Sequence, residues 1–79
     1  MIYKISGGDV IRAAMTAKKV TVKDAAKALG IHHQTVIKHR SSGNNLTMDT
    51  LQKYSDWLDL ELSQMFAFAE AEKLLAKGV

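Results

Sequence analysis

Apolar residues recur every three or four positions along most of this chain, a spacing typical of α-helices with one buried face. The first such segment predicts a helix that begins at a cap, Asp9, and runs to about Lys18. Its inward face consists of Val10, Ile11, Ala14 and Met15. Ahead of it, residues 6–8 (Ser-Gly-Gly) indicate a turn. Residues 1–5 alternate in a β-prone pattern, so a short strand and a frayed arm are both open there.

The next pattern, between residues 21 and 39, predicts two short helices joined by a tight turn. Thr21 is a suitable cap for the first of them, because its hydroxyl can accept from a free N–H group of the first turn. Asp24 follows three residues later, where a carboxylate suits the positive end of the helix. Gly30 ends this helix at a position that needs a left-handed backbone. Its short apolar face consists of Ala25, Ala26 and Leu29.

The following helix starts near His32 or His33 and turns Val36 inward. Its remaining side chains combine hydrogen-bonding, cationic and methyl-bearing groups, which is the chemistry that reading base edges in DNA requires. These candidate base-reading residues are His33, Gln34, Ile37 and Lys38.

The second half of the chain begins with small polar loop residues at 41–45. Thr47 then caps a fourth helix that Asp59 breaks, with an inward face of Leu51, Tyr54 and Leu58. A fifth helix starts near residues 61–62, and the helix-forming residues 68–77 extend it. Its predicted inward face consists of Met65, Phe66 and Ala69.

The segment at residues 21–39 resembles the helix-turn-helix of the Cro and phage-repressor family, often called the XRE family, at Ala26, Gly30, Ile31 and Val36. Leu46 to Phe66 resembles that family's fourth helix, break and fifth helix, so the resemblance covers roughly Val10 to Phe66. The segment is also similar to the headpiece of the lactose-repressor family. That family opens with the motif, whereas a whole helix precedes it here, so the first family is favoured. Val22 stands where many phage repressors carry glutamine, and His39 stands where a core aliphatic residue is usual.

The resemblance implies a compact all-α fold of five helices, lambda repressor-like, over a single domain at residues 1–79. It further implies a sequence-specific regulator of transcription that places its third helix in the major groove of double-stranded DNA. Phosphate contacts are expected at the start of the second helix, around the third helix and in the loop after it. The candidate phosphate-binding residues are Thr21, Lys23, His32, Arg40, Asn44 and Asn45.

Charge and composition agree with a nucleic-acid partner and narrow the class of protein. Eleven lysines and arginines oppose eight acidic residues among 79, giving a net charge of +3. Between residues 18 and 40 the imbalance is greater, since Asp24 alone opposes Lys18, Lys19, Lys23, Lys27, Lys38 and Arg40. There is no cysteine, no apolar run of the roughly 20 residues that a membrane span needs, and no leader pattern. We therefore expect a cytoplasmic protein without a membrane partner.

Other chemistry finds little support in the sequence. His32 and His39 are seven residues apart, whereas two metal ligands on one helix are usually three or four apart, so no metal or other cofactor is expected. His39 is better interpreted as a half-buried core histidine. No nucleophile motif, paired carboxylates or phosphate-binding glycine loop is present, so an enzyme is not expected either.

A small DNA-binding domain gains specificity by pairing two half-sites, so we expect a homodimer. Two surfaces are candidates for the interface: the strand-like residues 1–5, and the C-terminal half with Trp57, Phe68 and Leu75. The second is favoured, because exposed aromatic and leucine side chains bury the most apolar area. Two further classes remain open. One is an antitoxin, which would bind DNA and also a toxin protein through its C-terminal helix. The other is a phage recombination or excision accessory protein, which would bend DNA.

Overall fold

The structure is a computed structural model that describes residues 5–41 and 43–76. These residues form five helices and contain no strand: α1 (Gly7–Ala17), α2 (Val22–Leu29), α3 (His33–His39), α4 (Met48–Leu58) and α5 (Leu62–Ala76). The prediction of an all-α, five-helix fold is confirmed. The strand or arm considered for residues 1–5 lies outside the described residues, apart from Ile5, which packs against the core.

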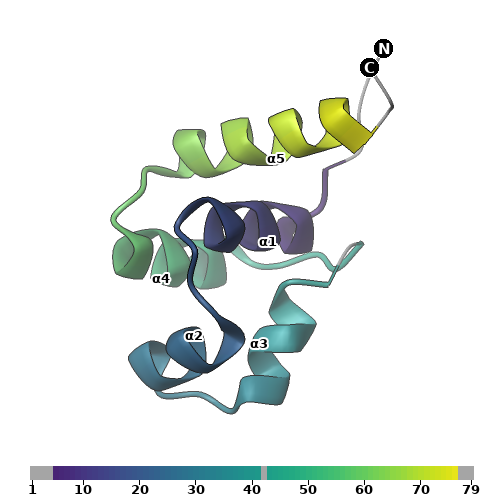
Figure 1. Cartoon of the computed structure of the whole chain (residues 1–79). Helices are drawn as coiled ribbons and strands as arrows, with labels where there is room; N and C mark the ends of the chain where they lie inside the picture. The colour runs from purple at the N-terminus through teal and green to yellow at the C-terminus, as the bar shows by residue number, and fades with distance from the viewer. Residues whose placement is uncertain (1–4, 42, 77–79) are drawn as a thin grey trace.

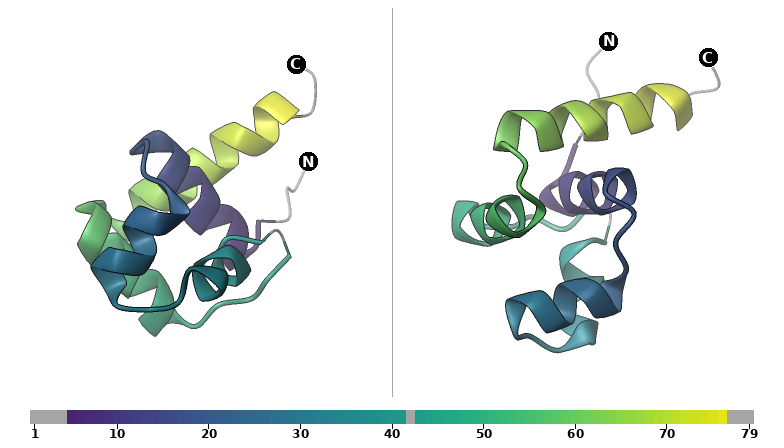
Figure 2. Two further views of the ribbon diagram at one scale, coloured as in Figure 1. Left: turned by 60° about the horizontal axis from the view of Figure 1, so that its bottom comes forward. Right: turned by 60° about the vertical axis from the view of Figure 1, so that its left-hand side comes forward.

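The helices are arranged around α1 (Figure 1). α5 covers one side of α1, and the pair of α2 and α3 lies on the opposite side, with α4 beside α1 (Figure 2). α1 contacts α3, α4 and α5 directly. The first helix therefore separates the helix-turn-helix unit, which is α2, the turn and α3, from the last helix.

The start of α1 differs from the sequence prediction. Asp9 is not the cap, because Ser6 is the N-cap and Asp9 is the third residue of the helix. The Ser6 hydroxyl accepts from the Asp9 backbone N–H at 3.2 Å, and the Asp9 carboxylate accepts from the Ser6 backbone N–H at 3.0 Å. Serine and aspartate both cap helices well, but only this reciprocal pairing satisfies two end N–H groups at once.

The caps predicted for the helix-turn-helix unit are confirmed. The Thr21 hydroxyl accepts from the Asp24 N–H at 3.1 Å, and the Asp24 carboxylate accepts from the Thr21 N–H at 2.9 Å. These hydrogen bonds stabilise the charged carboxylate and lower the pKa of Asp24. Gly30 ends α2 with φ of 66°, in the left-handed region where glycine carries no steric penalty.

The core is formed by the predicted inward residues of α1, α3 and α4 together with Ala25 of α2 and part of α5, and Ala26 and Leu29 of α2 pack against it. Phe66 is an exception, because 40% of its surface is exposed while Met65 and Ala69 are buried. The prediction that it shares their face is therefore wrong. The largest fully buried side chains are Tyr54, Ile11, Met15, Met65, Val10 and Val36.

A charged cluster fastens α5 to α1 beside this core. Asp9 is only 3% exposed, and its carboxylate lies 3.0 Å from the Arg12 guanidinium and 3.5 Å from the Lys73 ammonium. Arg12 also lies 3.2 Å from the carboxylate of Glu72. A buried carboxylate needs such partners, because an unpaired charge in the interior is costly. The cluster therefore fixes how α5 lies on α1.

Candidate nucleic-acid interface

α3 presents one face to the core and the opposite face to solvent. Val36 is fully buried, and this anchors the helix against the rest of the fold. The four candidate base-reading residues are all exposed, so the structure brings them together on the outer side of a single helix: His33, Gln34, Ile37 and Lys38. Ile37 has 48% of its surface exposed, so its apolar side chain is available to a partner.

A shallow groove of about 530 Å³ runs along this outer side of α3. Its lining combines an amide, an ammonium, two hydroxyls and an apolar side chain, from Gln34, Lys38, Thr35, Ser41 and Ile37. At the other end of α3, the exposed rings of His32 and His33 stack with their centroids 5.3 Å apart. The groove contains no acidic side chain that would repel a nucleic acid.

The start of α2 provides a second polar surface. The Thr21–Asp24 pairing occupies the N–H groups of those two residues. Among the described residues, no hydrogen bond uses the N–H groups of Val22 and Lys23. Free N–H groups at the positive end of a helix are suited to bind a phosphate, and the exposed side chain of Lys23 adds a cation.

The loop after α3 is fixed against the start of α1. The Gly8 N–H donates to the Asn44 carbonyl at 3.0 Å, and the Gly43 N–H donates to the Ser6 hydroxyl at 2.9 Å. The Asn44 side-chain amide donates to the Lys38 carbonyl at 2.6 Å. Asn44 therefore holds the end of α3 in place, whereas Asn45 is exposed.

Gly8 is a structural requirement beside the candidate interface that the sequence prediction of a turn at residues 6–8 does not reveal. A Cβ atom at Gly8 would lie 1.7 Å from the Ser41 backbone oxygen, so only glycine fits where α1 meets the loop after α3. Nothing in the local sequence signals this contact, since the two residues are far apart along the chain.

His39 connects α3 to α4 from the inner side. Its Nδ1 lies 3.0 Å from the hydroxyl of Tyr54, which is 1% exposed, and the two rings pack edge to face. Burial, followed by the positive charges of Lys53 and Lys38, lowers the pKa of His39. His39 is half-buried, as the sequence predicts. A polar pair thus occupies the place where the family that the segment resembles usually has a core aliphatic residue.

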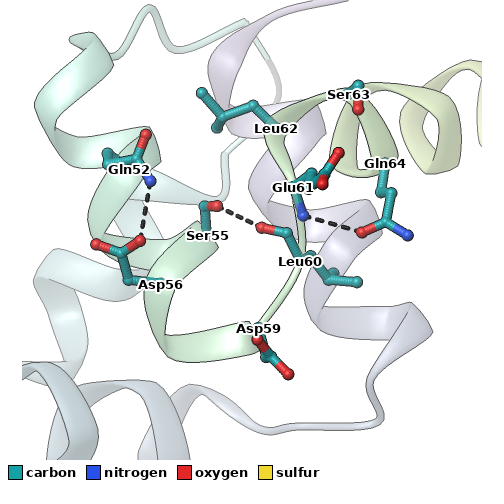
Figure 3. A pocket seen from close by; sticks show the side chains of 9 residues that line it. All are labelled: Gln52, Ser55, Asp56, Asp59, Leu60, Glu61, Leu62, Ser63 and Gln64. Carbon is teal, nitrogen blue, oxygen red and sulfur yellow. Dashed lines mark hydrogen bonds between the residues drawn. The ribbon is translucent and has the colours of Figure 1, made fainter.

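The junction of α4 and α5 carries negative charge, in contrast to the lysines of α2 and α3. A pocket of about 760 Å³ at the junction of α4 and α5 is lined by Asp56, Asp59 and Glu61 (Figure 3). Gln52 donates to the Asp56 carboxylate at 2.9 Å, and the side-chain oxygen of Gln64 accepts from the Glu61 N–H at 2.9 Å. Three carboxylates would repel phosphates, so this pocket is not part of a nucleic-acid interface.

The three candidate interface residues do not form one uniform surface. Phe68 and Leu75 are exposed on α5, at 38% and 77%, whereas Trp57 is half-buried on α4 and packs against the core. Phe68 and Leu75 are seven residues apart, two helical turns, and so lie on the same side of α5. The exposed apolar surface is therefore mainly on the last helix.

Among residues 5–41 and 43–76, no group of three or more His, Cys, Asp or Glu side chains is placed to hold a metal ion. Within the same part of the chain, no helix is both long enough and apolar enough to cross a membrane.

Comparison with known proteins gives one result. The family described as Cro/C1-type HTH DNA-binding domain matches residues 10–70, which is most of the chain. No curated protein and no solved structure matches.

Proposed function

Because the chain belongs to the family of Cro/C1-type HTH DNA-binding domains, we propose that it is a sequence-specific regulator of transcription that reads double-stranded DNA with α3. The outer face of α3 supports this function most directly. The four exposed side chains are held over a buried Val36, and they offer groups that match base edges in the major groove. Gln34 can pair with adenine through two hydrogen bonds, and Lys38 can donate to guanine or to a phosphate. Ile37 can contact a thymine methyl group.

Phosphate contacts would position α3 in the groove. Thr21 and Lys23 would hold one phosphate at the start of α2, where two backbone N–H groups have no partner among the described residues. His32, Arg40 and Asn45 would contact the strand on either side of α3. Asn44 would add to this contact only with the part of its amide that does not bind Lys38.

A selection of binding sites from random duplexes tests this function. We expect a defined sequence motif, and Gln34→Ala should weaken binding to it by about 1–3 kcal/mol and relax discrimination at one base pair. Gln52→Ala is the matched control, because Gln52 is exposed on α4 and binds Asp56. Enrichment of no motif, or an equal loss on selected and scrambled duplexes, would contradict direct reading by Gln34.

We also propose that two copies bind together through the outer side of α5. Phe68 and Leu75 are exposed there, and aromatic and leucine side chains bury much apolar area when they meet a partner. Removing residues 68–79 would be a poor test, because Ala69, Glu72 and Lys73 hold α5 on α1. Phe68→Glu with Leu75→Glu should instead give a folded monomer. Met48→Glu is the control, since Met48 is 61% exposed on α4.

The same exposed side of α5 supports the antitoxin alternative, in which a toxin protein occupies this surface. Sedimentation of the full chain, alone and on its selected duplex, separates the two. A dimer that the paired glutamates dissociate supports self-association. A monomer in both conditions would contradict it, and co-purification with a second small protein would favour the antitoxin. Bending of DNA with little preference for sequence would favour a recombination accessory protein.

A further inference from the structure

A second pocket lies between the helix-turn-helix unit and α4, on the inner side of α3. It has a volume of about 290 Å³ and is lined by residues from the end of α2, the turn, the end of α3 and the middle of α4. We propose that this pocket binds a small organic carboxylate with a single apolar ring or a branched apolar chain. This site goes beyond the proposed DNA binding, because it would give the regulator a small-molecule ligand as well.

One side of the pocket is apolar. Ala28, Leu29 and Ile31 line it from the end of α2 and the turn, and Leu29 and Ile31 also pack against the core. Ligand pockets range from roughly 300 to 1,000 Å³ and are mostly lined by apolar groups with a few polar groups that fix orientation. A pocket at the lower limit of that range fits a ligand of about one ring.

The other side of the pocket is polar and carries positive charge. It is lined by Thr50, Lys53 and Tyr54 of α4 and by His39 of α3, and no acidic side chain lines it. The Tyr54 hydroxyl is paired with Nδ1 of His39, so Nε2 is the ring nitrogen that remains for a ligand. The ammonium of Lys53 acts on this ring, since its charge contributes to the lowered pKa of His39.

The positive charge of Lys53 and the lack of an acidic side chain in the pocket lining favour an anionic ligand over a neutral or cationic one. A carboxylate would pair with the Lys53 ammonium and accept hydrogen bonds from neighbouring donors, while its apolar part would cover Leu29 and Ile31. The acidic pocket between α4 and α5 has the opposite charge and would reject the same molecule (Figure 3).

The experiment is an NMR titration of the full chain with sodium benzoate at pH 7.5 and constant ionic strength. Benzamide serves as the neutral probe of nearly the same shape. We expect saturable shifts of the Leu29 and Ile31 methyl signals with benzoate. Benzamide should bind up to roughly fivefold more weakly, the range that one exposed ion pair provides. Lys53→Met should reduce the affinity for benzoate to that for benzamide. Lys18→Met replaces an exposed lysine at the end of α1 and should leave the affinity for benzoate unchanged.

Each other outcome would overturn the proposal. Shifts that do not saturate, or that fall mainly on lysines outside the pocket, would show that benzoate does not occupy this pocket. Equal affinity for benzamide, or equal loss in both lysine variants, would remove the role of the carboxylate and of Lys53. The proposed reading of DNA by α3 is tested separately, because this titration contains no DNA.

Discussion

Replacing Gly8 with alanine should be strongly destabilising, although alanine is normally the better residue in a helix. The new Cβ would lie 1.7 Å from the Ser41 oxygen and 2.7 Å from the Ser41 carbonyl carbon. Real Cβ atoms essentially never lie within 3.0 Å of a non-bonded heavy atom from another part of the chain, so the backbone at Ser41 must move away. Because Ser41 lies two residues after the end of α3, the displacement would reach the end of the candidate base-reading helix.

The expected cost combines three terms. Overpacking of a close contact costs about 1–3 kcal/mol. Moving the loop also strains the hydrogen bonds from Gly8 to Asn44 and from Gly43 to Ser6, at about 0.5–1.5 kcal/mol each. Alanine returns about 0.5–1 kcal/mol through its greater helix propensity. Together these terms give a net loss of about 1–5.5 kcal/mol. Each kcal/mol should lower the melting temperature by about 4–8 °C in a chain of this length.

Thermal and urea unfolding followed by circular dichroism measure this loss. Gly7→Ala is the matched control, because its Cβ would lie 3.0 Å from Leu46 Cβ and 3.1 Å from the Leu46 backbone nitrogen, contacts that a shift of Leu46 by a few tenths of an ångström relieves. We expect the control to change stability by less than about 1 kcal/mol. If both variants melt like the parent, the close approach of α1 to the loop after α3 is wrong.

Three further predictions concern the charge, the turn and the inner side of the site. Lys23→Ala should weaken binding to all duplexes alike and reduce the slope of log K against log salt by about one unit; an unchanged slope would remove Lys23 from the phosphate backbone. Gly30→Val should cost about 1–2 kcal/mol in urea unfolding, because φ is 66° and no atom lies within 4 Å of the new Cβ, so the cost is conformational. Gly30→Asn should cost less, and equal losses would contradict this origin. Burial lowers the pKa of His39 in the folded protein. As the pH falls, His39 is therefore protonated in the unfolded chain before it is protonated in the folded protein. The stability that neutral His39 contributes should be fully present above pH 6.5, the ordinary pKa of histidine. It should be lost as the pH falls from 6.5 toward the lower pKa of His39 in the folded protein. The free energy of unfolding of the parent, relative to His39→Gln, should therefore decrease from pH 7 to pH 5, and a constant difference would refute the assignment.

The sequence predicted those features of the fold that local rules determine. Thr21 and Gly30 follow capping chemistry that acts over three or four residues, and both were located correctly. The sequence prediction places the start of α1 three residues too late, because Ser6 and Asp9 are both good caps and only their reciprocal pairing identifies Ser6 as the N-cap. The contact of Gly8 with Ser41 could not be predicted, because it arises from the packing of segments that are distant in sequence.

α5 shows why periodicity alone could not locate every buried side. Apolar residues occur on both its inner and its outer sides, so the spacing of Met65, Phe66 and Ala69 does not reveal which of them faces α1. The ion pairs of Arg12 with Glu72 and of Asp9 with Lys73 fix the orientation, and neither pair has a local signal. The exposed residues of α3 were easier to predict, because α3 has a single buried anchor at Val36.

The fastening of α5 on α1 also has a consequence during synthesis of the chain. Arg12 and Glu72 are separated by 60 residues, so the side of α1 that α5 covers stays open until almost the whole described chain has left the ribosome. The helix-turn-helix unit emerges well before that point, and its short-range contacts can form early. During synthesis, the docking of α5 is then the last step of folding. A ribosome that stalls before residue 65 would release a chain without Met65 and Ala69 of α5, so the apolar side of α1 that they cover would be exposed to chaperones and proteases.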